Sequence, residues 1–207
     1  LGHEQSLMEA LREACSHSGF WLLAFGFFVC GFQVVFIGVH LPAYLVDQHL
    51  PATVGTTVLA LIGLFNIFGT YLAGNLGQKL PKRYLLSGIY GLRSVVTVLF
   101  LLAPLSPWSV YCFTAAMGFL WLSTVPLTNA TIAQIFGVQH LSMLGGFVFF
   151  SHQVGSFMGV WLGGYLYDRT GSYDVVWYIA IGLGIFAGLV NLPVKEAPIQ
   201  RGTPQPA

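Results

Sequence analysis

Five polar side chains lie far apart in the sequence, each inside a long apolar stretch: Gln33, Asn66, Arg93, Thr124 and His152. Amide, hydroxyl, imidazole and guanidinium groups bind small solutes through hydrogen bonds, and the guanidinium adds a fixed positive charge. At a helical rise of about 1.5 Å per residue, all five fall near the middle of their stretches. Polar groups at that depth are costly and usually face a bundle interior or a wet cavity. We therefore predict that these residues belong to one solute-binding layer.

Two further hydroxyl groups extend this layer. Thr70 follows Asn66 by one helical turn, and Ser156 follows His152 by four residues, so each pair shares a helix face. His152 is a candidate ligand contact or proton acceptor, because imidazole exchanges protons near neutral pH. The alternative for His152 is a hydrogen-bonded contact between helices.

Arg93 is the only charged residue in the interior of the apolar stretches, which contain no Asp or Glu except at their ends. It either contacts the substrate, locks one conformation between helices, or bonds backbone carbonyls in a structural role. An uncompensated positive charge favours an anionic or neutral polar solute over a cation. Small organic anions such as carboxylates are therefore the natural candidates.

The same residues argue against enzymatic chemistry. Ser151 and His152 are adjacent and point to diverging helix faces, so they cannot pair as nucleophile and base. No H-E-x-x-H pattern or acidic pair suggests a metal centre, and we expect no catalytic residue, metal or cofactor. A formal net charge of +1, without a basic surface interleaved with aromatic residues, gives no reason to expect nucleic acid as a partner.

The elements that must position these residues follow from composition. Charged residues make up 7% of the chain, against about 25% in a soluble domain, and residues 94–167 contain no Asp, Glu, Lys or Arg. A lipid bilayer solvates such a run, and about 20 mostly apolar residues cross it as a helix. We predict an all-α membrane protein with Pro126 kinking its fourth helix. Its six transmembrane helices are expected at residues 19–46, 52–76, 84–102, 110–136, 142–167 and 173–192.

The distribution of basic residues predicts the orientation. Six crossings place both termini and the loops after the second and fourth helices on one side of the membrane. Of the basic residues, only Arg169 falls in a loop on the other side. By the positive-inside rule we expect both termini in the cytoplasm. The basic residues on the cytoplasmic side are Arg12, Lys79, Lys82, Arg83, Lys195 and Arg201.

The chain divides into three predicted parts. Residues 1–18 form a cytoplasmic lead-in, residues 19–192 the six-helix bundle and residues 193–207 a cytoplasmic tail. Within the lead-in, Ser6 and Glu9 form a capping-box pattern before a short amphipathic run. This pattern predicts a helix on the membrane surface.

An internal repeat relates two of the predicted helices. When the chain is shifted by 90 residues, the second helix aligns with the fifth, and three glycines coincide: Gly55 with Gly145, Gly69 with Gly159 and Gly74 with Gly164. The two helices run in opposite directions. The pattern therefore predicts a three-plus-three inverted repeat, which is frequent among secondary transporters.

Two loops carry related motifs. The loop after the second helix reads G-N-L-G-Q-K-L-P-K-R, and the one after the fifth reads G-Y-L-Y-D-R-T-G. Both are similar to the G-x-L-A-D-R-x-G-R-[KR] loop of the major facilitator superfamily, from which Gln78 and Pro81 depart. The residues that carry the motifs are Gly74, Lys79, Lys82 and Arg83 in the first loop and Gly164, Asp168, Arg169 and Gly171 in the second.

This resemblance covers nearly the whole chain. It implies half of a twelve-helix major facilitator fold, namely the C-terminal half of a secondary transporter that works by alternating access. Its partners would be the lipid bilayer, an N-terminal six-helix half, a small-molecule substrate and a proton or counter-substrate. Residues 1–18 would belong to the linker between the halves, and the first loop motif would act as a cytoplasmic latch. Residues 159–173 resemble bacterial monocarboxylate-porter-like and oxalate/formate-antiporter-like members, which implies the inner membrane of a bacterium.

Two aromatic side chains are expected near the periplasmic end of the first helix. His40 and Tyr44 follow Gln33 at helical spacing and either form a gate or meet lipid headgroups. The predicted function is transport of a small organic anion. The alternatives are transport of a neutral polar or drug-like solute, and a non-transporting membrane scaffold or receptor.

Overall fold

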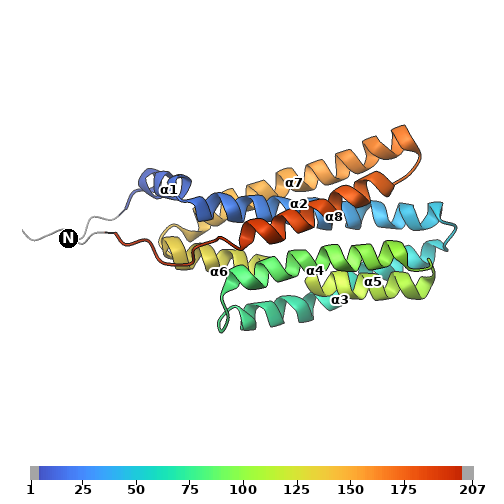
Figure 1. The fold of residues 1–207 in the computed structure, drawn as a ribbon, viewed down its shortest axis with the longest axis horizontal. Helices are drawn as coiled ribbons and strands as arrows, with labels where there is room; N and C mark the ends of the chain where they lie inside the picture. The colour runs from blue at the N-terminus through green and yellow to red at the C-terminus, as the bar shows by residue number, and fades with distance from the viewer. Residues whose placement is uncertain (1–4, 202–207) are drawn as a thin grey trace, which may run out of the picture.

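The computed structural model describes residues 5–201, which form a bundle of helices joined by loops (Figure 1). The lead-in carries the predicted short helix, and both hydrogen bonds of the capping box between Ser6 and Glu9 are present. The helices of this range are α1 (Leu7–Ser16), α2 (Ser18–Asp47), α3 (Ala52–Leu76), α4 (Lys82–Leu102), α5 (Pro107–Leu120), α6 (Thr124–Phe136), α7 (Leu141–Thr170) and α8 (Asp174–Asn191).

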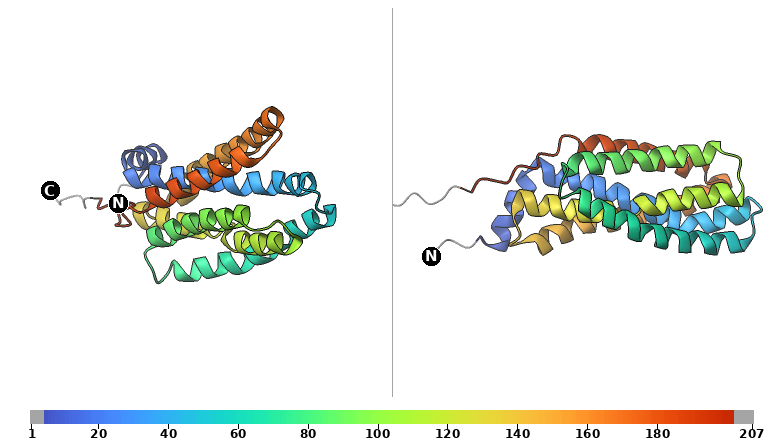
Figure 2. Two further views of the ribbon diagram at one scale, coloured as in Figure 1. Left: turned by 45° about the vertical axis from the view of Figure 1, so that its right-hand side comes forward. Right: turned by 90° about the horizontal axis from the view of Figure 1, so that it is seen from below.

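The long helices run roughly side by side, and both described ends of the chain lie at the same end of the bundle (Figures 1 and 2). We call this the terminal end and the opposite one the far end. α2 packs along α7 and also touches α8, α3 packs along α5, and α4 packs along α8. The all-α fold class is confirmed.

The inverted repeat is visible in the closest helix contacts. A Cβ atom on Gly69 of α3 would lie 1.6 Å from the Phe119 carbonyl oxygen, and one on Gly159 of α7 would lie 2.5 Å from the Phe32 carbonyl oxygen. Gly159 follows Gly69 by 90 residues, and Phe119 follows Phe32 by 87. The α3–α5 contact and the α7–α2 contact are therefore equivalent under the repeat, and glycine is required in both because backbone meets backbone.

The pairing of α4 with α8 obeys the same symmetry. The Ser87 hydroxyl donates to the Gly188 carbonyl at 2.5 Å, and the Ser94 hydroxyl donates to the Ile181 carbonyl at 2.9 Å. A displacement of 94 residues exchanges these two bonds with one another. The pseudo-two-fold axis therefore passes between α4 and α8, as expected for three-plus-three topology.

Among residues 5–201, five segments are long and apolar enough to cross a membrane: α2, α3, α4, the combined segment Pro107–Phe136 and α8. The remaining predicted crossing, the fifth along the chain, corresponds to α7, which matches α2 in length at 30 residues. α7 is less apolar because Gly, Ser, His and Gln residues interrupt it. Its polar Ser151 hydroxyl is satisfied within the bundle by the Ala24 carbonyl of α2, at 2.8 Å.

The C-terminal tail, as far as residue 201, runs across the terminal end of the bundle. The Glu196 carboxylate accepts from the Arg83 backbone N–H at the start of α4, at 2.7 Å. Arg201 donates to the Phe136 carbonyl at 2.8 Å and pairs with Glu13 of α1 at 2.7 Å. The Arg201 guanidinium lowers the pKa of the Glu13 carboxyl below its ordinary value of 4.5. The tail thus ties α1, α4 and α6 together.

Candidate functional site

Three residues of the predicted layer lie at an interruption of the fourth predicted helix: Asn66, Arg93 and Thr124. α5 ends at Leu120 and α6 begins at Thr124, so residues 121–123 connect two half-helices. Pro126 lies in the first turn of α6, lacks an N–H, and clashes with a helical carbonyl four residues earlier. The sequence predicted a kink at Pro126, whereas the structure shows a full interruption. Backbone groups freed inside a membrane segment require other partners.

Arg93 binds the carbonyls that the end of α5 leaves free. Its Nε and Nη2 donate to the Leu120 carbonyl at 3.2 and 2.7 Å, and Nη2 also donates to the Trp121 carbonyl at 2.5 Å. The side chain is fully buried, and its guanidinium carbon lies 5.3 Å from the Tyr90 ring centroid. Because the C-terminal end of a helix carries partial negative charge, the guanidinium stabilises it. Arg93 therefore makes the backbone bonds expected of its structural role.

One nitrogen of the guanidinium is not used in this way. Arg93 Nη1 is buried without a hydrogen-bond partner among residues 5–201. Arg93 also makes no salt bridge within this range, in which the salt bridge present joins Arg201 to Glu13. A buried donor on a cation without a counter-ion creates a local preference for an anionic or strongly accepting group.

Asn66 and Thr70 support the other side of the interruption. The Asn66 Oδ1 accepts from the Leu122 backbone N–H at 3.0 Å and from the Thr70 hydroxyl at 3.1 Å. The Ser123 hydroxyl donates back to the Phe119 carbonyl at 2.7 Å. α3 and α4 therefore hold the interruption from two sides, through Asn66 and Arg93.

Sequence reasoning missed the role of one residue in this region. The Cys30 Sγ lies 3.3 Å from the Thr124 Oγ1, and both side chains are fully buried. This contact connects α2 to the first residue of α6. Cys30 precedes Gln33 by one helical turn, but a lone cysteine without a ligand pattern gives no signal of such a contact.

His152 lies between aromatic rings on the α2 side of α7. Its ring stacks on Phe149 with centroids 5.3 Å apart and lies 5.0 Å from Phe27. The Nδ1 has weak contacts with Ser156 and Gln153, both at 3.4 Å, while the buried Nε2 has no partner among the described residues. Ser156 donates its stronger bond to the His152 carbonyl at 2.8 Å. The His152 side chain also interacts with the Cys30 side chain of α2, although the Nε2 makes no hydrogen bond among the described residues.

Gln33 lies on the side of α2 that faces α8. Its Nε2 donates to the Ala180 carbonyl at 2.8 Å, and its buried Oε1 has no partner among the described residues. The structure therefore brings Asn66, Arg93 and Thr124 together at the interruption. It places Gln33 in a separate contact that joins α2 to α8.

His40 and Tyr44 belong to an aromatic cluster at the far end. The His40 Nε2 lies 2.9 Å from the Val160 carbonyl oxygen, and its ring lies 5.4 Å from Tyr173. Tyr44 lies 5.8 Å from Trp177 and 6.2 Å from Tyr173, measured between ring centroids. These contacts join α2, α7 and α8 at their far-end turns.

The first loop motif lies against α6. Lys82 donates to the Gln134 side chain at 2.7 Å, and the loop lines a hollow of about 480 Å³ together with Pro126 and Leu127. A Cβ atom on Gly77 would lie 2.6 Å from the Leu127 side chain. Gly74 lines the same hollow, whereas Lys79 is exposed. The motif is thus placed to respond to movement of α6.

The second loop motif ends α7 at the far end. Gly171 has a left-handed backbone with φ of 71°, and its N–H donates to the Tyr167 carbonyl at 2.7 Å. The Arg169 guanidinium carbon lies 5.4 Å from the Tyr165 ring centroid. Gly164 lies beside the His40 ring, and Asp168 is exposed.

Comparisons with known proteins agree with this architecture. The family model of the Major Facilitator Superfamily matches residues 2–132. An uncharacterized MFS-type transporter, YcxA of Bacillus subtilis (strain 168), is 30% identical over 87% of this chain and 47% of its own length. The hexuronate transporter of the same bacterium is 27% identical over 80% of this chain and 42% of its own.

A mammalian protein is also similar. Monocarboxylate transporter 13 of Bos taurus is 28% identical over 75% of this chain and 37% of its own length. The chain therefore spans about half, or less, of the length of the curated relatives that it matches.

Proposed function

Because the chain belongs to the major facilitator superfamily, we propose that it is the C-terminal half of a secondary transporter of a small organic anion such as a carboxylate. It is an integral membrane protein, and its relatives include named transporters. The N-terminal half, the substrate and any proton or counter-substrate are parts of this proposal.

The observation that carries the proposed substrate class is the state of Arg93. The guanidinium lies deep in a membrane segment with one unpartnered nitrogen and no acidic partner among the described residues. His152 adds an unpartnered ring nitrogen on α7. Both groups favour a solute that carries negative charge and hydrogen-bond acceptors. The names of two relatives, a hexuronate and a monocarboxylate transporter, support the same class.

The proposed transport movement uses the interruption between α5 and α6. Arg93 and Asn66 hold the two half-helices through backbone bonds to residues 120–122. Tilting α6 about this point would change the surroundings of Thr124 and the first loop motif together. Arg93 then acts as a state-dependent lock as well as a source of positive potential. Thr70, Ser156 and Gln33 remain proposed members of the lining, and His40 with Tyr44 the proposed far-end gate.

The proposed orientation places the terminal end in the cytoplasm of a bacterium. The exposed Cys15 of α1 provides a direct check of this orientation. A membrane-impermeant maleimide should label Cys15 in inside-out vesicles and leave it unlabelled in intact cells. The reverse result would invert the proposed topology.

The experiment that tests the function is uptake of radiolabelled small carboxylates by the full-length parent protein in proteoliposomes at several pH values. Wild type should show saturable uptake, and Arg93→Ala should abolish it while Arg93→Lys, which keeps the charge, retains part of it. Arg12→Ala removes an exposed arginine of α1 and should leave uptake unchanged. His152→Ala should change the pH dependence if this residue takes part in proton coupling.

Two results would contradict the proposal. If wild type transports sugars or cations and no carboxylate, the anion assignment is wrong and Arg93 is structural. If the reconstituted parent transports no solute, the scaffold or receptor alternative holds. Size-exclusion profiles of every variant separate loss of transport from loss of folding.

A further inference from the structure

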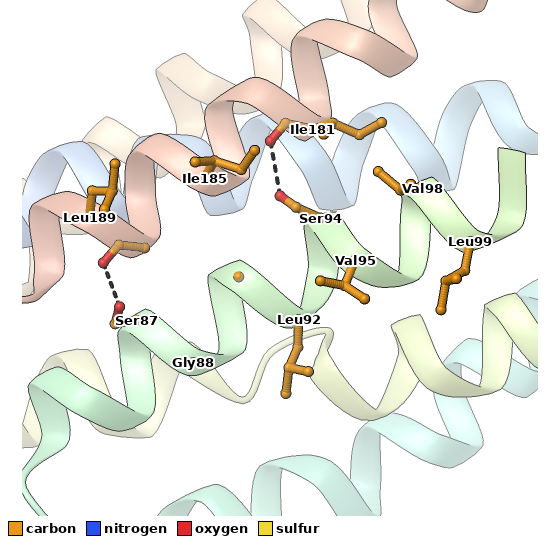
Figure 3. Close-up of a pocket in the computed structure, with 12 residues that line it drawn as sticks. Ser87, Gly88, Leu92, Ser94, Val95, Val98, Leu99, Ile181, Ile185 and Leu189 are labelled. Carbon is orange, nitrogen blue, oxygen red and sulfur yellow. Dashed lines mark hydrogen bonds between the residues drawn. The ribbon is translucent and has the colours of Figure 1, made fainter. Parts of the chain in front are cut away.

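The outer surface between α4 and α8 contains an apolar groove of about 550 Å³ (Figure 3). Its walls are partly exposed aliphatic side chains, and its floor contains glycines. The bonds from Ser87 and Ser94 to α8 close the groove beneath and hold the two helices together. Six of the lining side chains are Leu92, Val95, Leu99, Ile181, Ile185 and Leu189.

Two glycines of α4 leave this groove open without any contact that requires them. A Cβ atom on Gly88 or Gly91 would meet no atom within 4 Å. Gly69 and Gly159 differ, because their Cβ positions are blocked by a neighbouring backbone. A glycine inside a helix costs roughly 1 kcal/mol relative to alanine. No atom of the described chain fills the space beside Gly88 and Gly91, so packing within the chain does not explain the two glycines.

The terminal-end part of the groove lies within one leaflet of the bilayer. From Ser87 to Leu99 it extends about 18 Å along α4 at a rise of about 1.5 Å per residue. One leaflet of a bilayer contributes about half of the ~30 Å hydrocarbon thickness. Arg93, at mid-membrane, is the central residue of this stretch, so the part of the groove from Ser87 to Leu92 lies in the leaflet at the terminal end. The aliphatic lining of that part suits an acyl chain whose headgroup lies at the terminal end.

Basic and aromatic side chains lie at the terminal-end mouth of the groove. Arg83 precedes Ser87 by four residues and Tyr84 precedes Gly88 by four, so each lies one turn beyond a groove residue on the same face of α4. The Arg83 guanidinium lies 4.7 Å from the Tyr84 ring centroid and donates to its hydroxyl at 3.0 Å.

The tail brings a second basic residue to this mouth. The bond from the Arg83 N–H to Glu196 places the exposed Lys195 beside the start of α4. The Glu196 carboxylate is engaged by that backbone N–H, whereas the Arg83 guanidinium bonds a neutral phenol. Clustered Arg and Lys at a membrane surface attract anionic headgroups.

We propose that the α4–α8 groove binds an anionic phospholipid, with one acyl chain in the groove and the phosphate against Arg83 and Lys195. The site lies on the outer surface of the bundle, and its occupancy does not depend on which solute is transported. Its failure and the failure of the proposed function are therefore distinguishable.

The test is native mass spectrometry of the purified protein, titrated with phosphatidylglycerol or phosphatidylcholine in detergent. Wild type should retain phosphatidylglycerol preferentially. Gly91→Leu adds a side chain whose Cβ meets no atom within 4 Å, so it should fill the groove and abolish retention of both lipids. Arg83→Gln should weaken the binding of phosphatidylglycerol about fivefold and leave the binding of phosphatidylcholine unchanged.

Gly182→Leu is the matched control, because Gly182 is an exposed glycine of α8 with equally open surroundings and does not line the groove. It should retain lipid like wild type. Equal retention by wild type and Gly91→Leu would overturn the proposal. So would a lipid-free dimer that Gly91→Leu converts to monomer, since the groove would then bind a second copy of the chain.

Discussion

The two repeats of this bundle share their glycine contacts but differ in their first helices. In the first repeat α2 is continuous through Pro42, whereas its counterpart in the second repeat is divided into α5 and α6. The contact that Gly159 makes with α2 recurs where Gly69 meets α5. Packing is thus duplicated, while the interruption is particular to one repeat.

Asn66 and Arg93, two polar residues that bind backbone groups, lie where the two repeats differ. At the displacement of 90 residues His152 corresponds to Ile62 and Ser156 to Asn66. At the displacement of 94 residues that relates α4 to α8, Arg93 corresponds to Ala187. Asn66 and Arg93 both bind backbone groups at the interruption. Contacts duplicated by symmetry therefore build the fold, and residues without a counterpart are the ones to examine for function.

The strongest test of the duplicated packing is alanine at the paired glycines. Gly69→Ala and Gly159→Ala each place a Cβ against a backbone carbonyl and should each cost about 3 kcal/mol or more of folding free energy. Gly63→Ala on α3 meets no atom within 4 Å and should be neutral or slightly stabilising. Unfolding in detergent measures all three. A large effect in only one repeat would show that the packing is not equivalent.

A smaller loss is expected from Arg93→Ala. This change leaves the Leu120 and Trp121 carbonyls without their donor in a buried setting, at a cost of about 2–4 kcal/mol. Arg93→Lys should recover part of this stability because an ammonium group can still donate. Chemical unfolding of the three proteins tests this. Unchanged stability of Arg93→Ala would show that the interruption holds without it.

The corresponding polar positions on α3 and α7 should differ. Asn66→Ala removes the acceptor of the buried Leu122 N–H and should cost about 1–3 kcal/mol. Ser156→Ala removes a hydroxyl bonded within its own helix and should cost about 0.5 kcal/mol or less. Equal losses in thermal unfolding would mean that the interruption does not distinguish the repeats.

The smallest effect concerns α1 and the tail, which lie outside the repeat. Since the pKa of Glu13 is lowered by Arg201, the pair stabilises the fold above the ordinary carboxyl value of 4.5 and loses this contribution as pH falls through the lowered pKa. Arg201→Gln should therefore cost about 0.2–1 kcal/mol at neutral pH.

The pH dependence provides the control for this weak pair. The stability difference between wild type and Arg201→Gln should vanish in acid, where Glu13 is protonated in both proteins. Arg12→Gln changes an exposed arginine of the same helix and should show no such dependence. A difference that persists in acid would assign the effect to the bond from Arg201 to the Phe136 carbonyl.

The sequence was sufficient for the capping box of α1, the inverted repeat and the helices, except that the fourth predicted helix is divided into α5 and α6. Uncharged runs indicate which segments are buried in the membrane, and glycine spacing indicates where helix backbones touch. Both features depend mainly on local residue type. Counting along the helices also placed Asn66, Arg93 and Thr124 at a common depth, and the structure brings them to the same interruption.

The partners of these groups could not be predicted. Arg93 binds backbone carbonyls that lack a partner within the helix because α5 stops at Leu120, several residues before Pro126. Where a proline distorts a helix depends on whether neighbouring helices can satisfy the freed groups, which is a tertiary property. Cys30 gave no signal for the same reason, since its contact with Thr124 requires α2 and α6 to be assembled.

α7 emerges from the ribosome long after α2. Because α7 is weakly apolar, we expect its insertion into the membrane to depend on α2 being there already. A segment with Ser151, His152 and Gln153 at its centre enters lipid poorly alone. Once α2 is in place, it offers a carbonyl to Ser151 and a backbone surface to Gly159. We expect an insertion reporter placed after α7 to cross the membrane efficiently only when α2 precedes it. That result would show that membrane integration of α7 is cooperative with that of α2.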